Sequence, residues 1–199
     1  MIRRTKSFSN NNGIQQYFVP TADGKPQNCT IVTLGVGNDI SAETQFKRAY
    51  PHCSFTGVDP VADGNEALYK QQLGGTFHDL AVTNDGGDVP TRVLTDRGHE
   101  FKHVPKIPLS YFMLKYVSSS VVDDLLIDVA GAEYSMLSVF LRNGELTLNG
   151  FIVCQWNVEL HAPSDDEKGI VHKFFADNAA DGGFIPLIAS TGMKRKSRR

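Results

Sequence analysis

The chain has 199 residues, of which 41% are hydrophobic and 21% are charged, a balance typical of one globular domain. No apolar run approaches the roughly 20 residues that a membrane span needs, and the first residues lack the apolar stretch of a secretory signal. The net charge is −2, but eight basic residues near the two ends leave a remainder with 12 basic and 22 acidic residues. These features argue against nucleic acid and membranes as partners and favour a cytoplasmic location.

The composition divides the chain into a polar lead-in over residues 1–28, a domain over 29–190 and a basic tail over 191–199. The lead-in is rich in Asn, Gly and Pro, which predicts a poorly ordered segment with a short helix or strand near residues 14–19. Three cysteines lie in or beside expected strands, and this predicts buried free thiols in a reducing compartment. They are Cys29, Cys53 and Cys154.

The domain begins with a strand, a glycine turn, a helix and a second strand. Residues 29–34 are an apolar, β-branched run, which is typical of a strand buried on both faces. Gly35 and Gly37 follow directly and let the backbone turn sharply and lie close to a ligand. A second strand over 54–58 ends on Asp59, whose carboxylate can accept hydrogen bonds from both hydroxyls of a ribose. The pattern predicts a unit that binds a nucleoside-containing cofactor.

The residues after the glycine turn distinguish two classes of cofactor. A dinucleotide fold needs a third glycine for close helix–strand packing, and Ile40 stands at that position. S-adenosylmethionine has no pyrophosphate to cradle, so the turn favours it over NAD or FAD. The next helix is expected over residues 42–50, with Asn38, Asp39 or Ser41 as its cap.

The middle of the chain continues the alternation and then becomes irregular. A helix over 64–73 and a third strand over 76–82 are expected. Asp79 lies where the base of a bound nucleotide would be, and it is either an acceptor for an exocyclic amine or a surface acid. Residues 83–107 are expected to cover one side of the cofactor site. A helix over 109–117 follows Pro108.

One short motif in this middle part suggests a metal site. Residues 99–103 read HEFKH and match H-E-x-x-H, which places two zinc-binding histidines on one face of a helix. Gly98 precedes the motif and Pro105 follows it by two residues, which leaves little room for a helix. We therefore expect no metal here and assign no metal ligands elsewhere.

The second half of the chain repeats the alternation of strands and helices. The expected elements are a strand over 124–129, a helix over 133–142, a long strand over 151–160, a helix over 165–178 capped by Ser164, and a strand over 184–189. The whole order predicts an α/β fold, a Rossmann-like and mostly parallel sheet with helices on both faces. Ligands of such sheets bind at the carboxyl ends of the strands. The acids, glycine and histidine expected there are Gly35, Asp59, Asp79, Asp128, Glu159 and His161.

Five segments, in this order and spacing, resemble the FkbM-type S-adenosylmethionine-dependent methyltransferases, in particular FkbM-domain proteins of nematodes, over residues 28–190. The segments read VTLGVGND, FTGVD, HDLAVTN, LLIDVAGAEYSML and CQWNVELH. The resemblance implies the methyltransferase sheet, S-adenosylmethionine as cofactor and O-methylation of a small molecule or sugar, and it leaves the oligomeric state open. It implies that Gly35, Gly37, Asp59, Asp79 and Ala81 contact the cofactor. It also implies that Asp128 lies beside both the substrate and the amino acid part of the cofactor, and that Glu159 and His161 face the substrate.

Methyl transfer to a hydroxyl needs a base, and we expect His161 or Glu159 to be that base, with Asp128 orienting the substrate. Two features depart from the family. Ala130 replaces the first glutamate of the motif D-x-E-G-A-E, and the final strand pair is absent or replaced after Ala189. These departures favour a second interpretation, a non-catalytic or degenerate protein of the same fold. A nicotinamide oxidoreductase and a zinc hydrolase are further alternatives, and the observations above on the third glycine and on HEFKH count against them.

Overall fold

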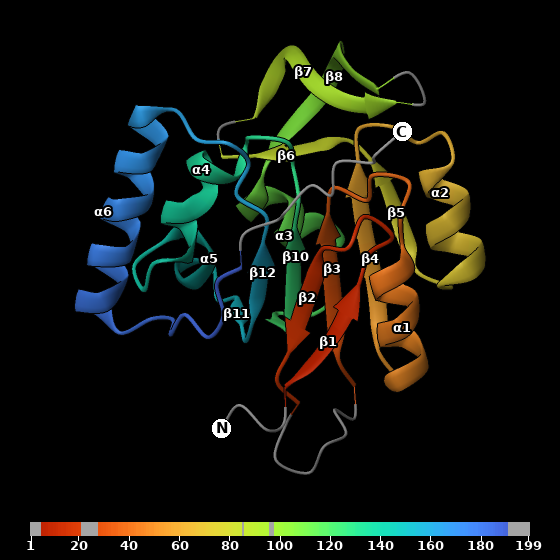
Figure 1. The fold of residues 1–199 in the computed structure, drawn as a ribbon, viewed down its shortest axis with the longest axis horizontal. Helices are drawn as coiled ribbons and strands as arrows, with labels where there is room; N and C mark the ends of the chain where they lie inside the picture. Colours follow the sequence, from red (N-terminus) through yellow and green to blue (C-terminus); the bar gives the residue numbers. More distant parts are fainter. Residues whose placement is uncertain (1–4, 21–27, 85, 96–97, 191–199) are drawn as a thin grey trace, which may run out of the picture.

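A parallel sheet of five strands forms the centre of the molecule, in the order β12-β10-β3-β4-β5 (Figure 1). Its strands are β3 (Thr30–Leu34), β4 (Ser54–Asp59), β5 (Thr76–Asp79), β10 (Asp124–Ile127) and β12 (Trp156–Val158). The structure is a computed structural model that describes residues 5–20, 28–84, 86–95 and 98–190. All residues of β3 and β10 are buried, as expected for parallel strands covered on both faces. The α/β fold predicted from the sequence is confirmed.

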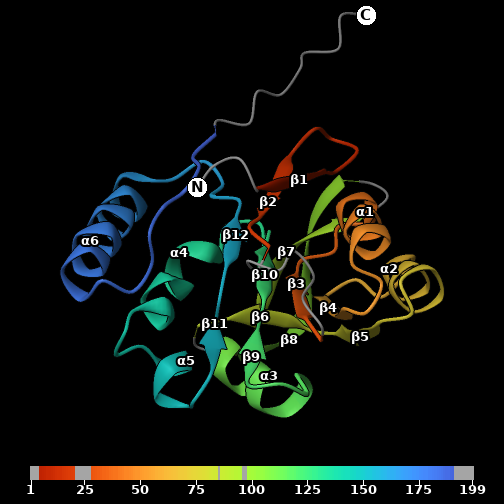
Figure 2. The same ribbon diagram turned by 90° about the horizontal axis from the view of Figure 1, so that it is seen from below.

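Helices cover both faces of this sheet, as the view in Figure 2 makes clear. One face carries α1 (Ser41–Ala49), α2 (Asn65–Ala67) and the π-helical turn η2 (Leu68–Gln72), and the other carries α3 (Leu109–Tyr116), α4 (Glu133–Met136), the 3₁₀ helix η3 (Leu137–Phe140), α5 (Glu145–Leu148) and α6 (Asp165–Asp181). Side chains alternate between the faces along each strand. Ile31 therefore packs into the hydrophobic cluster beneath α1, and Val32 and Leu34 pack into the cluster beneath α3 and α4.

An N-terminal hairpin covers part of the first face. Its strands β1 (Lys6–Ser9) and β2 (Gln15–Phe18) are antiparallel. Phe8 and Phe18 are buried, with their ring centroids 4.9 and 4.7 Å from that of Phe46 in α1. Much of the segment that we expected to be poorly ordered is therefore held by aromatic packing, and the short helix or strand expected near residues 14–19 is the strand β2.

A second, three-stranded sheet lies beyond the carboxyl ends of the parallel strands (Figure 1). It consists of β6 (Ala81–Thr83), β8 (Gly98–Pro108) and β7 (Gly87–Thr95), in that order. The single strand predicted over 76–82 was wrong, because the chain leaves the main sheet after Asp79 and joins this one. HEFKH lies in the extended strand β8, so the prediction that it is not helical is confirmed.

The long strand predicted over 151–160 is two short strands. Ile152–Val153 (β11) pair with Val121–Val122 (β9), and the chain then moves to pair with β10 as β12. The break occurs because Cys154 N–H donates to the Val122 carbonyl, whereas the Gln155 carbonyl accepts from Leu125. The helix predicted over 133–142 is also shorter, since it tightens to 3₁₀ geometry at Leu137 and ends at Phe140.

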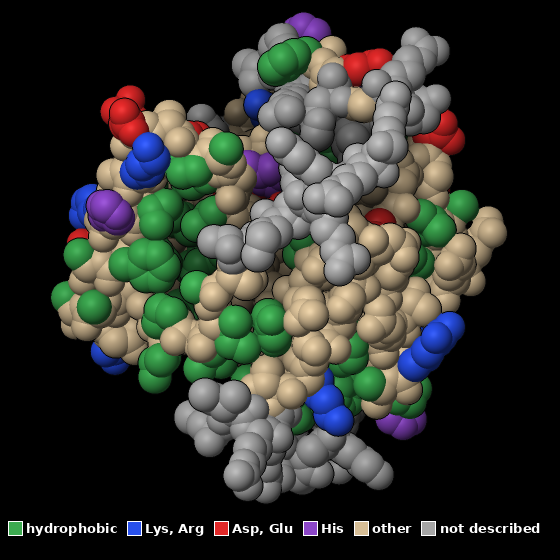
Figure 3. All heavy atoms as spheres, in the orientation of Figure 1, with side chains coloured by type: hydrophobic (Ala, Val, Ile, Leu, Met, Phe, Trp, Pro, Cys, Tyr) green, Lys and Arg blue, Asp and Glu red, His purple; other side chains and the backbone are tan. Residues whose placement is uncertain are grey.

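The last predicted helix is confirmed and the last predicted strand is wrong. Ser164 caps α6 by accepting from Glu167 N–H, as expected. Residues 184–190, which the structure describes, form no strand. The side chain of Asn178 near the end of α6 bonds both the N–H and the carbonyl of Phe184, and the Phe184 ring packs edge-on against Trp156 of β12, so this segment contacts the sheet through a side chain and does not pair with it as a strand. Ile185 is 80% exposed, and Figure 3 shows hydrophobic side chains gathered on the surface beside α6.

Two of the three cysteines are bonded to each other, which corrects the prediction of free thiols. Cys29 and Cys53 form a disulfide, with their Cα atoms 4.5 Å apart. Each cysteine stands directly before its strand, and the register pairs Thr30 with Ser54 across β3 and β4. The two cysteines are thus brought side by side by strand pairing. Cys154 is the free cysteine and is exposed, so the argument from free thiols for a reducing compartment no longer holds.

Candidate active site

The predicted site residues lie along one edge of the parallel sheet, at the carboxyl ends of its strands. In strand order they are Glu159 and His161 after β12, Asp128 after β10, Gly35 after β3, Asp59 at the end of β4 and Asp79 at the end of β5. The common direction of the strands brings residues from both halves of the chain to this edge. They form two groups, one around His161 and one around the glycine turn.

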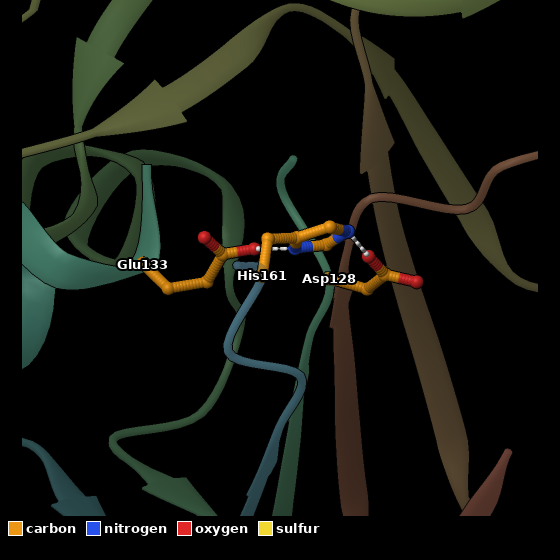
Figure 4. A group of neighbouring side chains, drawn as sticks. All are labelled: Asp128, Glu133 and His161. Atoms are coloured by element: carbon orange, nitrogen blue, oxygen red, sulfur yellow. Dashed lines mark hydrogen bonds and ion pairs between the residues drawn. The ribbon is translucent and has the colours of Figure 1, made fainter. Parts of the chain in front are cut away.

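His161 stands between two carboxylates, those of Glu133 and Asp128 (Figure 4). Its Nδ1 lies 2.8 Å from Oε1 of Glu133, and its Nε2 lies 3.5 Å from Oδ1 of Asp128. The side chain of Glu133 is completely buried, whereas those of His161 and Asp128 are 33% and 45% exposed. The group therefore has a buried side at Glu133 and an open side at Asp128.

Glu133 is held by the loop that precedes it. Its Oε1 also accepts from Val129 N–H at 3.0 Å, and its Oε2 accepts from Gly131 N–H at 2.7 Å. We assigned no role to Glu133 from the sequence. The signal was present, since Glu133 is the last residue of the family motif that begins at Asp128.

The loop from Val129 to Ala132 reaches this geometry through two left-handed residues. Ala130 has φ 54° and Gly131 has φ 109°. A left-handed conformation costs a residue with a Cβ roughly 1–2 kcal/mol, which glycine avoids. The next residue after Glu133, Tyr134, donates its hydroxyl to the carbonyl oxygen of His161. The start of α4 therefore holds His161 both by its ring and by its backbone.

Negative charge accumulates around His161. Burial and, after it, the neighbouring charge of Glu159 together raise the pKa of Asp128 to about 6. The pKa of His161 is raised, first by its hydrogen bond to Glu133 and then by the charges of Glu133, Asp128 and Glu159, although burial opposes this rise. Three acids around one histidine favour the binding of a cation or the transfer of a proton at this position.

The same atoms are close enough together to suggest a metal. Ligand atoms of Asp128, Glu133 and His161 lie within 4.8 Å of one another. However, the Glu133 carboxylate already accepts from two backbone N–H groups and lies against Nδ1 of His161, so three of its about four acceptor positions are occupied. His161 also directs Nδ1 to Glu133, so Nε2 and the Asp128 carboxylate are what the group presents to a ligand. Glu133 is therefore placed to orient the histidine.

The second group is built on the glycine turn. Oδ2 of Asp59 accepts from the N–H groups of Val36 and Gly37 at 2.9 and 3.0 Å, and Oδ1 accepts from Val61 N–H at 2.8 Å. Asp59 is buried, and burial raises its pKa against these three bonds. The carboxylate fastens the turn and has about one acceptor position left. It can therefore accept from one ribose hydroxyl, whereas we expected it to accept from two.

Gly35 lies between the two groups and has a packing role that the sequence did not reveal. Its φ is +84°, and a Cβ at this position would lie 1.8 Å from the carbonyl oxygen of Asp128. The absence of a side chain lets the end of β3 approach the end of β10. Gly35 thus sets the distance between the glycine turn and the histidine group.

The remaining two predicted cofactor residues lie in different surroundings. Asp79 is exposed and stands opposite Asp59 in the register of β4 and β5. Ala81 is buried in β6, where it packs with Val104 and Val61 in a small apolar cluster. Asp79 is therefore accessible from solvent, whereas the side chain of Ala81 is enclosed by apolar neighbours.

A surface pocket of about 390 Å³ lies outside both groups, between the β1–β2 turn, α1 and η2. Asn38 and Asp39 of the glycine turn are among its lining residues, together with Arg48 and Gln45. None of the residues predicted for the cofactor or the substrate lines it.

Comparison with models of protein families identifies the family of this chain. A family model described as the methyltransferase FkbM domain matches residues 5–186. The chain belongs to the FkbM methyltransferase family. Comparisons with curated proteins and with solved structures gave no significant match. The resemblance stated from the sequence is thus confirmed at the level of the family.

The FkbM domain of this chain extends beyond the segments that first suggested it. The match begins at residue 5 and so includes the N-terminal hairpin. It also covers the loop that contains Ala130. Within the described ranges, no helix is long and apolar enough to cross a membrane.

Proposed function

We propose that this protein is an S-adenosylmethionine-dependent methyltransferase that methylates a hydroxyl of a small molecule or sugar. Membership of the FkbM family supports methyl transfer as the reaction class. The observation that carries the proposal is the meeting of Asp128, Glu159 and His161 at the carboxyl edge of a parallel sheet, where ligands of such sheets bind. A basic nitrogen beside carboxylates is the chemistry that deprotonation of a hydroxyl requires.

The residues along the edge offer hydrogen-bond acceptors and negative charge that suit this cofactor. Gly35 and Gly37 place no side chain on either side of Val36 in the turn, and Asp59 keeps an acceptor for one ribose hydroxyl. The exposure of the Asp79 carboxylate beside Asp59 supports its proposed role as an acceptor for an adenine amine. The acids around His161 favour the positive charges of a sulfonium and an ammonium group.

His161 is the proposed base, and Asp128 is the proposed substrate-orienting residue. When bound, the cofactor supplies an electrophilic methyl group, which the acceptor oxygen takes from sulfur as the C–O bond forms and the C–S bond breaks. Nε2 of His161 accepts the hydroxyl proton, and Asp128, 3.5 Å away, stabilises the resulting imidazolium. Alignment of this kind lowers a barrier by roughly 7–11 kcal/mol, and a base contributes roughly 10²–10⁴-fold.

A second candidate is a degenerate FkbM-domain protein that binds the cofactor weakly or not at all. Ala130 favours it, because the family motif has a carboxylate at this position and the cluster here lacks it. The two candidates differ in whether the folded protein binds S-adenosylmethionine and S-adenosylhomocysteine.

The test is a thermal-shift and calorimetry screen with S-adenosylmethionine, S-adenosylhomocysteine and NAD. A ligand that binds only the folded state at 100 times its Kd stabilises it by about 2.7 kcal/mol. For a chain of this size we expect S-adenosylhomocysteine to raise the unfolding temperature by roughly 5–10 °C. No binding by folded protein would favour the degenerate protein, and tight NAD binding would favour an oxidoreductase.

A substitution at the same edge makes the screen specific for the site. Asp79→Asn is exposed, so folding should be unaffected, but the loss of a charged acceptor should weaken S-adenosylhomocysteine binding by about tenfold. Asp166→Asn, on the exposed face of α6, is the matched control and should bind as the wild type does.

A further inference from the structure

We propose that Glu133 is the positioning residue of His161: its buried carboxylate accepts the Nδ1 proton and thereby determines that Nε2 is the basic nitrogen. The contact measures 2.8 Å, within the range of a charge-assisted hydrogen bond. For turnover, the inference rests on the proposed function, in which Nε2 accepts the hydroxyl proton. For the state of the imidazole in the free protein, it stands independently.

Glu133 is suited to this task because it cannot turn away. Its side chain has no exposed surface, and N–H groups of Val129 and Gly131 hold its two oxygens from the loop side. Three groups therefore face the carboxylate: the two backbone N–H groups, which can only donate a hydrogen bond, and the ring of His161. A carboxylate accepts and does not donate, so the ring nitrogen that faces it must carry the hydrogen.

The tautomer follows from this constraint. A neutral imidazole has one N–H and one lone pair, so a hydrogen on Nδ1 leaves the lone pair on Nε2. Nε2 lies on the partly exposed side of the ring, 3.5 Å from Asp128 and within reach of a hydroxyl placed there. Tyr134, the neighbour of Glu133 in α4, donates to the carbonyl of His161 and fixes the backbone of the same residue.

The arrangement also stabilises the ring after it gains a proton. The groups that face His161 are Glu133 from the start of α4, Asp128 from the end of β10 and Glu159 from the end of β12. All three are acids, so each favours the imidazolium. Glu133 alone makes a close hydrogen bond to the ring in addition. Glu133, the ring of His161 and a substrate hydroxyl at Nε2 would therefore follow the order acid–histidine–substrate.

The first test measures the imidazole of the ligand-free wild-type protein. We expect ¹⁵N chemical shifts of His161 to show a proton on Nδ1 and none on Nε2 when the ring is neutral. A neutral ring that is protonated on Nε2 would overturn the proposal. This measurement needs neither cofactor nor substrate, so its failure is distinct from a failure of the protein to bind S-adenosylmethionine.

The second test compares Glu133→Gln with Glu159→Gln. The first variant removes the charge and the enforced acceptor, so the pKa of His161 should fall by about one unit or more and the tautomer should become mixed. The second removes a charge without a hydrogen bond, so the pKa should fall but the proton should stay on Nδ1. Equal behaviour of the two variants would contradict a specific role for Glu133.

Turnover gives a further measurement once an acceptor is known. Glu133→Gln should lower kcat at least about tenfold and shift the acidic limb of the pH–rate profile downward, with the affinity for S-adenosylhomocysteine retained. Because Glu133 is buried, Glu133→Asp serves as the second variant if Glu133→Gln does not fold. It keeps the charge and shortens the reach, so it should retain a raised pKa of His161 with a weakened preference for Nδ1.

Discussion

Gly35 brings the two groups of the candidate site together, because the absence of a side chain lets the end of β3 lie against the end of β10. We named it from the sequence as a residue that lets a ligand approach the backbone. In the structure, the nearest group is the carbonyl oxygen of Asp128, which would lie 1.8 Å from a Cβ at position 35. The glycine is therefore required by contact within the protein, whether or not a ligand is present.

Gly35→Ala should consequently destabilise the fold and displace the end of β10. We expect a loss of roughly 2–4 kcal/mol from the clash and the positive φ together, measured by urea unfolding. Gly74→Ala is the matched control, since Gly74 has φ +65° and a Cβ there would meet no atom within 4 Å. That variant should lose only about 1 kcal/mol. Equal losses in the two variants would show that the contact with Asp128 is unimportant.

At the scale of elements, the N-terminal hairpin is fastened to the sheet by side-chain amides. Gln155 accepts from Val19 N–H at 2.7 Å and donates to the Val19 carbonyl at 2.8 Å. Asn157, two residues further along, makes the same pair of bonds with Tyr17. The side chains of Gln155 and Asn157 face the same side and bond the backbone of residues 17 and 19, as the backbone of a neighbouring strand would. This clamp and the aromatic contacts described above join the N-terminal hairpin to the domain.

Gln155→Ala should release one end of the hairpin. Loss of two hydrogen bonds of about 0.5–1.5 kcal/mol each should speed hydrogen exchange at the Val19 amide by about tenfold or more. Gln155→Glu keeps the acceptor for Val19 N–H and loses the donor, so its effect should be intermediate. Unchanged exchange at Val19 in both variants would mean that aromatic packing alone holds the hairpin.

At the scale of the whole molecule, stability depends on acids buried in the core. Glu43 of α1 accepts from the hydroxyl of Thr33, which accepts in turn from Tyr69. Burial raises the pKa of Glu43 to about 7, and burial raises the pKa of Asp124 in β10 to about 8. Because the folded state holds these protons more tightly than the unfolded chain, each group favours folding at low pH and loses that contribution as the pH rises.

Glu43→Gln should remove one part of this dependence. The contribution of Glu43 is complete below about pH 4.5 and is lost as the pH rises through about 7, so the variant should gain roughly 3 kcal/mol relative to wild type between pH 4.5 and 8. Urea unfolding at several pH values measures this difference. Glu66→Gln on the exposed surface of α2 is the control and should follow the wild type. A constant difference between Glu43→Gln and wild type would contradict the prediction.

Much of the architecture was predictable because it depends on local patterns. The β-branched run of β3, the glycine turn and the capping residue of α6 each act within a few residues, and the alternation of strands and helices implied the parallel sheet. The same logic named Asp128 and His161, since both follow apolar strands. Family membership, read from motifs along the chain, was confirmed by the match over residues 5–186.

The sequence by itself therefore determined the order of the elements, the class of the fold and the family. Only the tertiary structure decided that Cys29 meets Cys53, that Asn178 binds the backbone of Phe184, and that Glu133 lies against His161. These three contacts depend on strand register, on the end of a helix and on a loop with two left-handed residues. Such geometry is set by packing between distant segments, so a local motif can include a residue such as Glu133 but does not give the residue that it contacts.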